Sequence, residues 1–146
     1  MNRHFVSLAS IAALSAFAFA FTTSVSAREP SPAGAEVYIV SPKDGDKVTS
    51  PVTVVFGLKG MGIAPAGFKM DGTGHHHLLI DSDPPADLSQ PLPANEKTVH
   101  FGKGQTETTV TLPPGKHTLQ LVLGDFLHIP HDPAVVSKKI TIEVTK

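Results

Sequence analysis

From residue 36 onward the sequence is a series of short runs in which apolar and polar residues alternate, separated by turns. Val52 to Leu58 has an apolar residue at every second position, and His117 to Leu123 alternates in the same way. The 12 glycines and 13 prolines all follow residue 27 and fall largely between the runs. A period of two is that of a strand with one buried face, and no long 3.6-residue period is present. The pattern therefore predicts an all-β fold.

Seven such runs predict strands at residues 37–40, 52–58, 75–81, 97–101, 105–112, 117–123 and 135–144. This number and spacing predict an immunoglobulin-like β-sandwich, with a different β-sandwich or a small barrel as alternatives. The turn Pro113-Pro114-Gly115 resembles the corner before the sixth strand of such domains, where an amphipathic ring bonds back to the backbone. His117 stands where that ring would be.

The first 27 residues have the pattern of a secretory leader. Phe5 to Phe21 is almost continuously apolar, and the small residues up to Ala27 match the site that signal peptidase cleaves. We expect a signal peptide at 1–27, a flexible lead-in at 28–35 and one immunoglobulin-like domain at 36–146. The predicted location is periplasmic or secreted, and no later stretch is apolar enough to span a bilayer.

Charge and cysteine content exclude several classes of function. The chain has 12 Lys and Arg against 13 Asp and Glu, so it has no basic footprint for nucleic acid or anionic lipid. It has no cysteine, which excludes disulfides, thiol nucleophiles and cysteine metal sites. Gly-x-Ser-x-Gly, His-Glu-x-x-His and phosphate-loop motifs are also missing. We therefore expect a protein that is not an enzyme, with a hydrolytic zinc site as the weaker alternative.

Histidine is the residue type that indicates chemistry. Seven of the eight histidines follow the leader, and the predicted topology brings six of these seven to one end of the sandwich. His75 and His77 point the same way from a strand, with Cα atoms about 6.5–7 Å apart. Pro130 stiffens the loop segment that carries His128 and His131. Because neutral imidazole is the commonest metal ligand, this end is predicted to bind a metal ion.

The predicted ligands are His75, His77, His128 and His131, and the further candidates are His76, His100, Met61, Met70 and Asp125. Imidazole with thioether favours copper, whereas imidazole with carboxylate favours zinc or Cu(II). Copper is the predicted metal and zinc the alternative. Each of these histidines also has a purely structural interpretation, as a surface or core residue. Because ligands at loop ends lie outside a packed core, replacing His75 and His77 with alanine is expected to change the stability of the metal-free protein little.

Two segments resemble an uncharacterised family of small exported bacterial proteins. They are GHHHLLID at 74–81 and PPG-x-HTLQL-x-LGD-x-x-H-x-PH-x-P at 113–133. The resemblance extends over most of 35–144 and implies an exported β-sandwich, but no activity, because that family is a domain of unknown function. From the residues we expect carriage or buffering of a metal ion. The alternative is a non-enzymatic interaction module whose histidine-rich end binds a protein, a glycan or another cell-envelope component.

Overall fold

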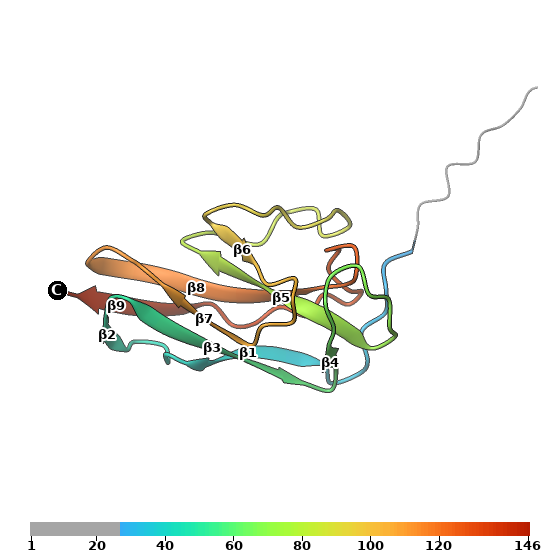
Figure 1. Cartoon of the computed structure of the whole chain (residues 1–146), viewed down its shortest axis with the longest axis horizontal. Helices are drawn as coiled ribbons and strands as arrows, with labels where there is room; N and C mark the ends of the chain where they lie inside the picture. The colour runs from blue at the N-terminus through green and yellow to red at the C-terminus, as the bar shows by residue number, and fades with distance from the viewer. Residues whose placement is uncertain (1–26) are drawn as a thin grey trace, which may run out of the picture.

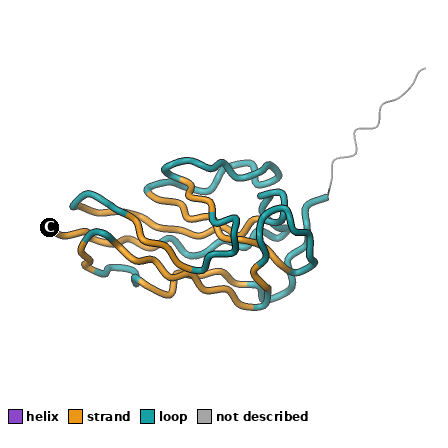
Figure 2. Tube along the Cα trace, viewed as in Figure 1, coloured by secondary structure: helices purple, strands orange, loops and turns teal. Residues whose placement is uncertain are grey.

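Two β-sheets lie face to face in the part of the chain that the computed structural model describes, residues 27–146 (Figures 1 and 2). The predicted signal peptide lies outside the described residues except for Ala27. Nothing within 27–146 forms a helix long and apolar enough to cross a membrane. The strands of this part are β1 (Glu36–Ser41), β2 (Lys47–Thr49), β3 (Val52–Lys59), β4 (Gly62–Ile63), β5 (Thr73–Ile80), β6 (Thr98–His100), β7 (Glu107–Val110), β8 (Gly115–Gly124) and β9 (Ile140–Thr145).

The order of the strands identifies the architecture. One sheet has the order β1-β3-β7, and the other has the order β2-β9-β8-β5, with β4 and β6 both paired to β5. All pairings are antiparallel except those of β2 with β9 and of β4 with β5. Of the seven predicted strands, the first, second and fifth (β1, β3 and β7) form one sheet, and the third, sixth and seventh (β5, β8 and β9) lie in the other. This is the arrangement of immunoglobulin-like sandwiches. The predicted fold class is therefore confirmed.

The core lies between the sheets and is filled by the alternating positions of the predicted runs. In β3 the residues Val52, Val54 and Phe56 are buried, and in β8 the residues Leu119 and Leu121 are fully buried opposite them. Burial of one such large apolar side chain contributes about 1.5–3 kcal/mol. The period of two therefore determined which face of each strand is inside.

The last predicted strand, 135–144, begins later than expected. Residues 135–137 run beside β8, where the Leu123 N–H donates to Val135 O, and β9 begins only at Ile140. The reason is Ser137, whose hydroxyl accepts the Leu121 N–H at 2.8 Å in place of a backbone carbonyl. A side chain thus interrupts the regular ladder between the two segments.

The segment 28–35, expected to be a flexible lead-in, lies along the loop that follows β8. The Ser31 N–H donates to Asp132 O at 3.2 Å, and the Asp132 N–H donates to Glu29 O at 2.9 Å. These bonds pair the segment with the loop in the manner of a short parallel strand.

His117 fills the corner at the start of β8, at the opposite end from the other histidines. Its Nε2 bonds to Pro113 O at 2.9 Å, as predicted, and its Nδ1 lies 2.7 Å from an Asp81 carboxylate oxygen. Burial lowers the pKa of His117, but the bonds to Asp81 and Pro113 outweigh burial, so the net shift is upward. Burial likewise raises the pKa of Asp81, and the bonds from His117 and Thr118 turn the net shift downward.

We predict that His117→Ala lowers the free energy of unfolding by about 1–3 kcal/mol, because it removes a buried ring and two hydrogen bonds. The ionic part of this loss depends on pH. It is present below the ordinary His117 pKa of 6.5 and fades as the pH rises through the raised value. It is present above the ordinary Asp81 pKa of 3.8 and fades as the pH falls through the lowered value. The urea midpoints of wild type and His117→Ala should therefore differ most between pH 3.8 and pH 6.5. Equal midpoints at pH 5.5 would contradict the corner role.

Candidate metal centre

The outer face of β5 carries the candidate site. Side chains alternate along β5, so His76 points between the two sheets while His75 and His77 point away from them. Leu79 shares this outer face and packs in a small second apolar cluster with residues of the covering loops. The connection between β5 and β6 contributes Leu92 to that cover and lies over β5 and β6 in Figure 1. Loops, not a third sheet, therefore enclose the outer face.

Two further histidines reach this face from other elements. β6 pairs with β5 so that His100 lies opposite His77, with ring centroids 5.1 Å apart. His128 comes from the loop after β8, and its φ of 68° lies in the left-handed region that residues other than glycine rarely adopt. Backbone bonds hold this conformation: the His128 N–H donates to Asp125 O, and His128 O accepts from the Leu92 N–H, both at 2.9 Å. The loop thus presents His128 to β5 in one fixed orientation.

The four-histidine group (His75, His77, His100 and His128) offers one ring nitrogen from each residue, all within 4.8 Å of one another. His75 Nε2 and His128 Nδ1 are 3.1 Å apart and share a hydrogen bond. Four ligand atoms arranged tetrahedrally at about 2.0–2.1 Å from one ion are roughly 3.4 Å apart. The widest pair must therefore close by at most about 1.5 Å, which ring rotations about the broad χ2 of histidine allow.

Two of the four rings, those of His75 and His77, are buried, and those of His100 and His128 are partly buried. His75 is 0% exposed and His77 is 1% exposed, so the expectation that they lie outside the packed core is wrong. Among the described atoms, neither nitrogen of His77 has a hydrogen-bond partner, nor has Nδ1 of His75 or Nε2 of His100. A buried polar atom without a partner destabilises a fold by about 1–3 kcal/mol. A metal ion is the kind of partner that fits several convergent imidazole nitrogens.

Burial also sets the protonation of three rings of the group, those of His75, His77 and His100. It lowers the pKa of His75 to about 4 and that of His77 to about 3, and repulsion between neighbouring rings adds to both shifts. The pKa of His100 is lowered by burial and by its neighbour His128. These rings are therefore uncharged at neutral pH, which is the form that coordinates a metal.

Residues 54–145, a span that holds the complete four-histidine group, match the family DUF4399, which is described as a domain of unknown function. The chain belongs to the DUF4399 family. The predicted membership of an uncharacterised family is thereby confirmed. Among solved structures, fibronectin(III)-like modules of CbhA from Clostridium thermocellum are similar, with a TM-score of 0.39 and 11% identity, over 75% of this chain and 45% of that chain. No curated protein matches the sequence significantly.

His131, a predicted ligand, lies outside the group, and His100 stands in its place. The His131 Nε2 is 3.1 Å from Thr73 O, and a Cβ added to Gly74 would lie 3.0 Å from the His131 ring. Since Gly74 is two residues from His76, this ring lies on the inner face of β5, away from His75 and His77. His76, a further candidate, also points inward, with its ring 5.0 Å from that of Phe56.

The remaining candidates are likewise outside the group. Asp125 is buried, and one of its carboxylate oxygens accepts the N–H groups of Leu127 and Ile129 at 2.8 and 2.9 Å. It therefore shapes the loop that carries His128. Met61 packs against the main core, and Met70 is 55% exposed. The soft thioether ligands that favoured copper in the sequence therefore lie in the main core and on the surface.

Two glycines make room for the rings, a role that sequence reasoning missed. A Cβ added to Gly102 would lie 2.3 Å from the His100 ring, and one added to Gly124 would lie 2.8 Å from the His77 ring. Gly102 is two residues from His100 in the chain, and Gly124 pairs with His75 across the β5–β8 ladder. A glycine beside a histidine-bearing strand was therefore the signal that could have moved His100 from the further candidates to the predicted ligands.

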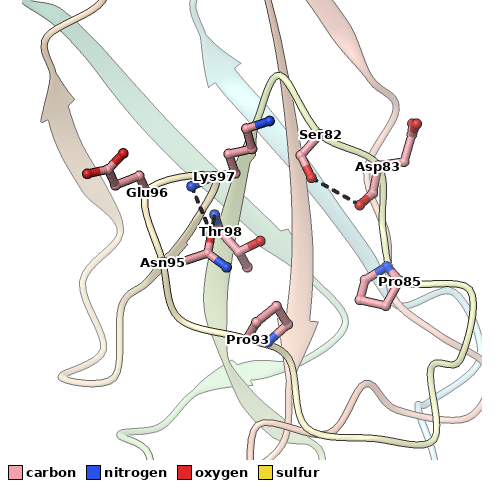
Figure 3. A pocket seen from close by; sticks show the side chains of 8 residues that line it. All are labelled: Ser82, Asp83, Pro85, Pro93, Asn95, Glu96, Lys97 and Thr98. Carbon is pink, nitrogen blue, oxygen red and sulfur yellow. Dashed lines mark hydrogen bonds between the residues drawn. The ribbon is translucent and has the colours of Figure 1, made fainter.

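An open pocket lies where β5 ends and β6 begins, between the segments 82–85 and 93–98 (Figure 3). Its polar groups belong to turns: the Asn95 side-chain oxygen accepts the Lys97 N–H at 2.9 Å, and the Ser82 hydroxyl donates to Asp83 O. Its lining residues include no histidine. The pocket is therefore separate from the four-histidine group and adds no imidazole ligand to it.

Proposed function

We propose that this protein binds one transition-metal ion at the four-histidine group and carries or buffers it in the cell envelope. The observation that supports this most strongly is the convergence of four imidazoles, several of whose nitrogens are buried without a hydrogen-bond partner. No purely structural role requires four histidines from three separate segments of the chain to meet. Unpaired nitrogens would destabilise such a cluster unless it served a ligand.

Copper is the metal that we propose, with zinc as the alternative. None of the four ligands carries a negative charge, so the charge of a bound ion stays uncompensated. Desolvation opposes a divalent ion more strongly than a monovalent one, which favours Cu(I). Among divalent ions, nitrogen ligands bind Cu(II) more tightly than Zn(II).

Carriage or buffering, and not catalysis, is favoured by the number of ligands. Catalytic zinc sites use three protein ligands and leave a fourth position for water or substrate, whereas closed sites use four. Four imidazoles in reach of one ion correspond to the closed type. This supports a protein that is not an enzyme.

The test is titration of tag-free, metal-free protein with Cu(I) under reductant, with Cu(II) and with Zn(II), each in competition with a chromophoric chelator. We expect one equivalent of copper to bind, and copper to bind more tightly than zinc. His100→Gln removes one of four ligands and should weaken binding at least about 100-fold, more than the loss of an outer-shell partner does. His117→Gln is the matched control, a buried histidine at the other end of the sandwich, and should bind as wild type does. If none of the three ions binds, the interaction-module alternative is the better one.

Export is a separate prediction. The apolar leader and the small residues before Arg28 predict cleavage after Ala27. Mass spectrometry of the protein from the periplasm or the medium should therefore find an N-terminus at or within a few residues of Arg28. Recovery of chains that begin at Met1 from the cytoplasm would contradict the proposed location.

A further inference from the structure

The segment 28–31 holds the loop that presents His128. The Arg28 side chain donates from Nε to Pro130 O at 2.9 Å and from a second nitrogen to His131 O. Its guanidinium also lies 3.7 Å from an Asp132 carboxylate oxygen. Ser31 adds a hydroxyl bond to Pro133 O at 2.7 Å.

The two limbs of this loop are held in different ways. The first limb continues directly from β8, and the bond from the Asp125 N–H to Ile129 O closes the turn. The second limb, 130–133, has carbonyl groups that face the segment 28–31. A planar guanidinium with several donors suits two successive carbonyls better than a single ammonium does.

The same segment is tied to the other loop at this end. Glu29 forms a 2.9 Å ion pair with Lys69, and Lys69 Nζ lies 5.2 Å from the centre of the Phe126 ring. The Gly67 N–H donates to Phe126 O at 2.8 Å. The start of the described chain therefore contacts the His128 loop from two sides.

We propose that residues 28–31 are a strap that positions His128 for metal binding, with Arg28 as the principal positioning residue. This inference rests on the proposed function. Arg28 touches no residue of the four-histidine group and acts through the 130–131 carbonyls, two residues beyond His128. Arg28 is the predicted first residue of the exported chain. The position of leader cleavage therefore decides whether the exported protein retains Arg28 and a complete strap.

The test compares Arg28→Ala, Arg28→Lys and the control Lys139→Ala in the exported chain. The control removes the same charge from another surface ion pair, that of Lys139 with Asp83. We expect Arg28→Ala to weaken copper binding several-fold, by less than the roughly 10- to 100-fold lost with an outer-shell partner, because Arg28 acts through the backbone of the loop and touches no ring of the group. Arg28→Lys should be intermediate and Lys139→Ala unchanged. Amide hydrogen exchange in the metal-free protein should accelerate at Leu127, His128 and Ile129 in Arg28→Ala, but not in the control.

The two proposals fail in distinguishable ways. If wild type binds no copper, the proposed function fails, and exchange at residues 127–129 still decides whether the strap holds the loop. If wild type binds copper while Arg28→Ala binds it within twofold and exchanges at the wild-type rate, only the strap is wrong. If Arg28→Ala does not fold, Ser31→Ala and Arg28→Lys give the same comparison with fewer bonds removed.

Discussion

Metal-free protein brought from pH 7.5 to pH 4.5 should lose most of its stability. Burial lowers the pKa of His75 and His76 to about 4 and that of His77 to about 3, against 6.5 for an ordinary histidine. Below pH 6.5 the unfolded chain therefore takes up protons that the folded chain does not, and each fall in pH favours unfolding. The loss ends only when the folded-state pKa values are reached.

The expected size of this loss is comparable to the whole stability of a small domain. One unit of pKa shift corresponds to about 1.4 kcal/mol, so three such histidines lower the free energy of unfolding by on the order of 5–8 kcal/mol at pH 4.5. Typical domains have about 5–15 kcal/mol in total. The pair of His117 and Asp81 does not cause this loss, because its stabilisation is retained between pH 6.5 and pH 3.8.

Urea unfolding of the metal-free protein at pH 7.5, 6.5, 5.5 and 4.5 measures the effect. The slope of the free energy of unfolding against pH gives the number of protons taken up on unfolding, and this number should approach about two to three near pH 5. A flat profile from pH 7 to pH 5 would show that these rings are accessible to protons in the folded state. Excess copper should shift the loss to lower pH, because the ion binds the folded state and competes with protons.

His77→Leu should have opposite effects on stability and on metal binding. Neither nitrogen of His77 has a hydrogen-bond partner, so an apolar side chain of similar volume removes a buried polar penalty and stabilises the metal-free protein by about 1–2 kcal/mol. The same change removes one of four ligands and should weaken copper binding at least about 100-fold. It should also reduce the loss of stability in acid, because one of the three titrating groups is gone.

The opposed signs distinguish a ligand from an ordinary core histidine. A histidine that only packs would leave copper binding unchanged, whatever leucine did to stability. The control is His117→Ala at the other end, which should lower stability and leave copper binding as in wild type. Chemical unfolding of the metal-free variants and chelator competition on the same preparations measure the two effects. A His77→Leu protein that binds copper as tightly as wild type would remove His77 from the site.

Such a trade between stability and function follows from the position of the site. A ligand group that is preorganised inside a covered face keeps unpaired nitrogens in the metal-free state, and the metal-free protein is less stable for it. The strap and the left-handed backbone of His128 have the same effect. Both hold the His128 ring against β5, and both reduce the conformational entropy of the loop.

The sequence by itself determined the sandwich and which end of it carries the histidines. The period of two assigned Val54, Leu121 and Ile142 to the core, and it placed His75 and His77 on one face of a strand. The corner at Pro113 and Gly115 predicted the backbone bond of His117 correctly. These properties are local, since they depend on alternation and turn chemistry within a few residues.

Only the tertiary structure decided what surrounds the ring nitrogens. His100 joined the group and His131 did not, because β6 pairs in register with His77 while the loop turns His131 to the inner face of β5. The outer face of β5 could not be predicted to be buried, since Leu79 on that face packs with Leu92 from the β5–β6 connection and with Val136 from the segment that runs beside β8. Alternation gives the direction of a side chain, but whether water, a loop or another imidazole meets it there depends on long-range packing, and that packing sets both the pKa values and the convergence of the four rings.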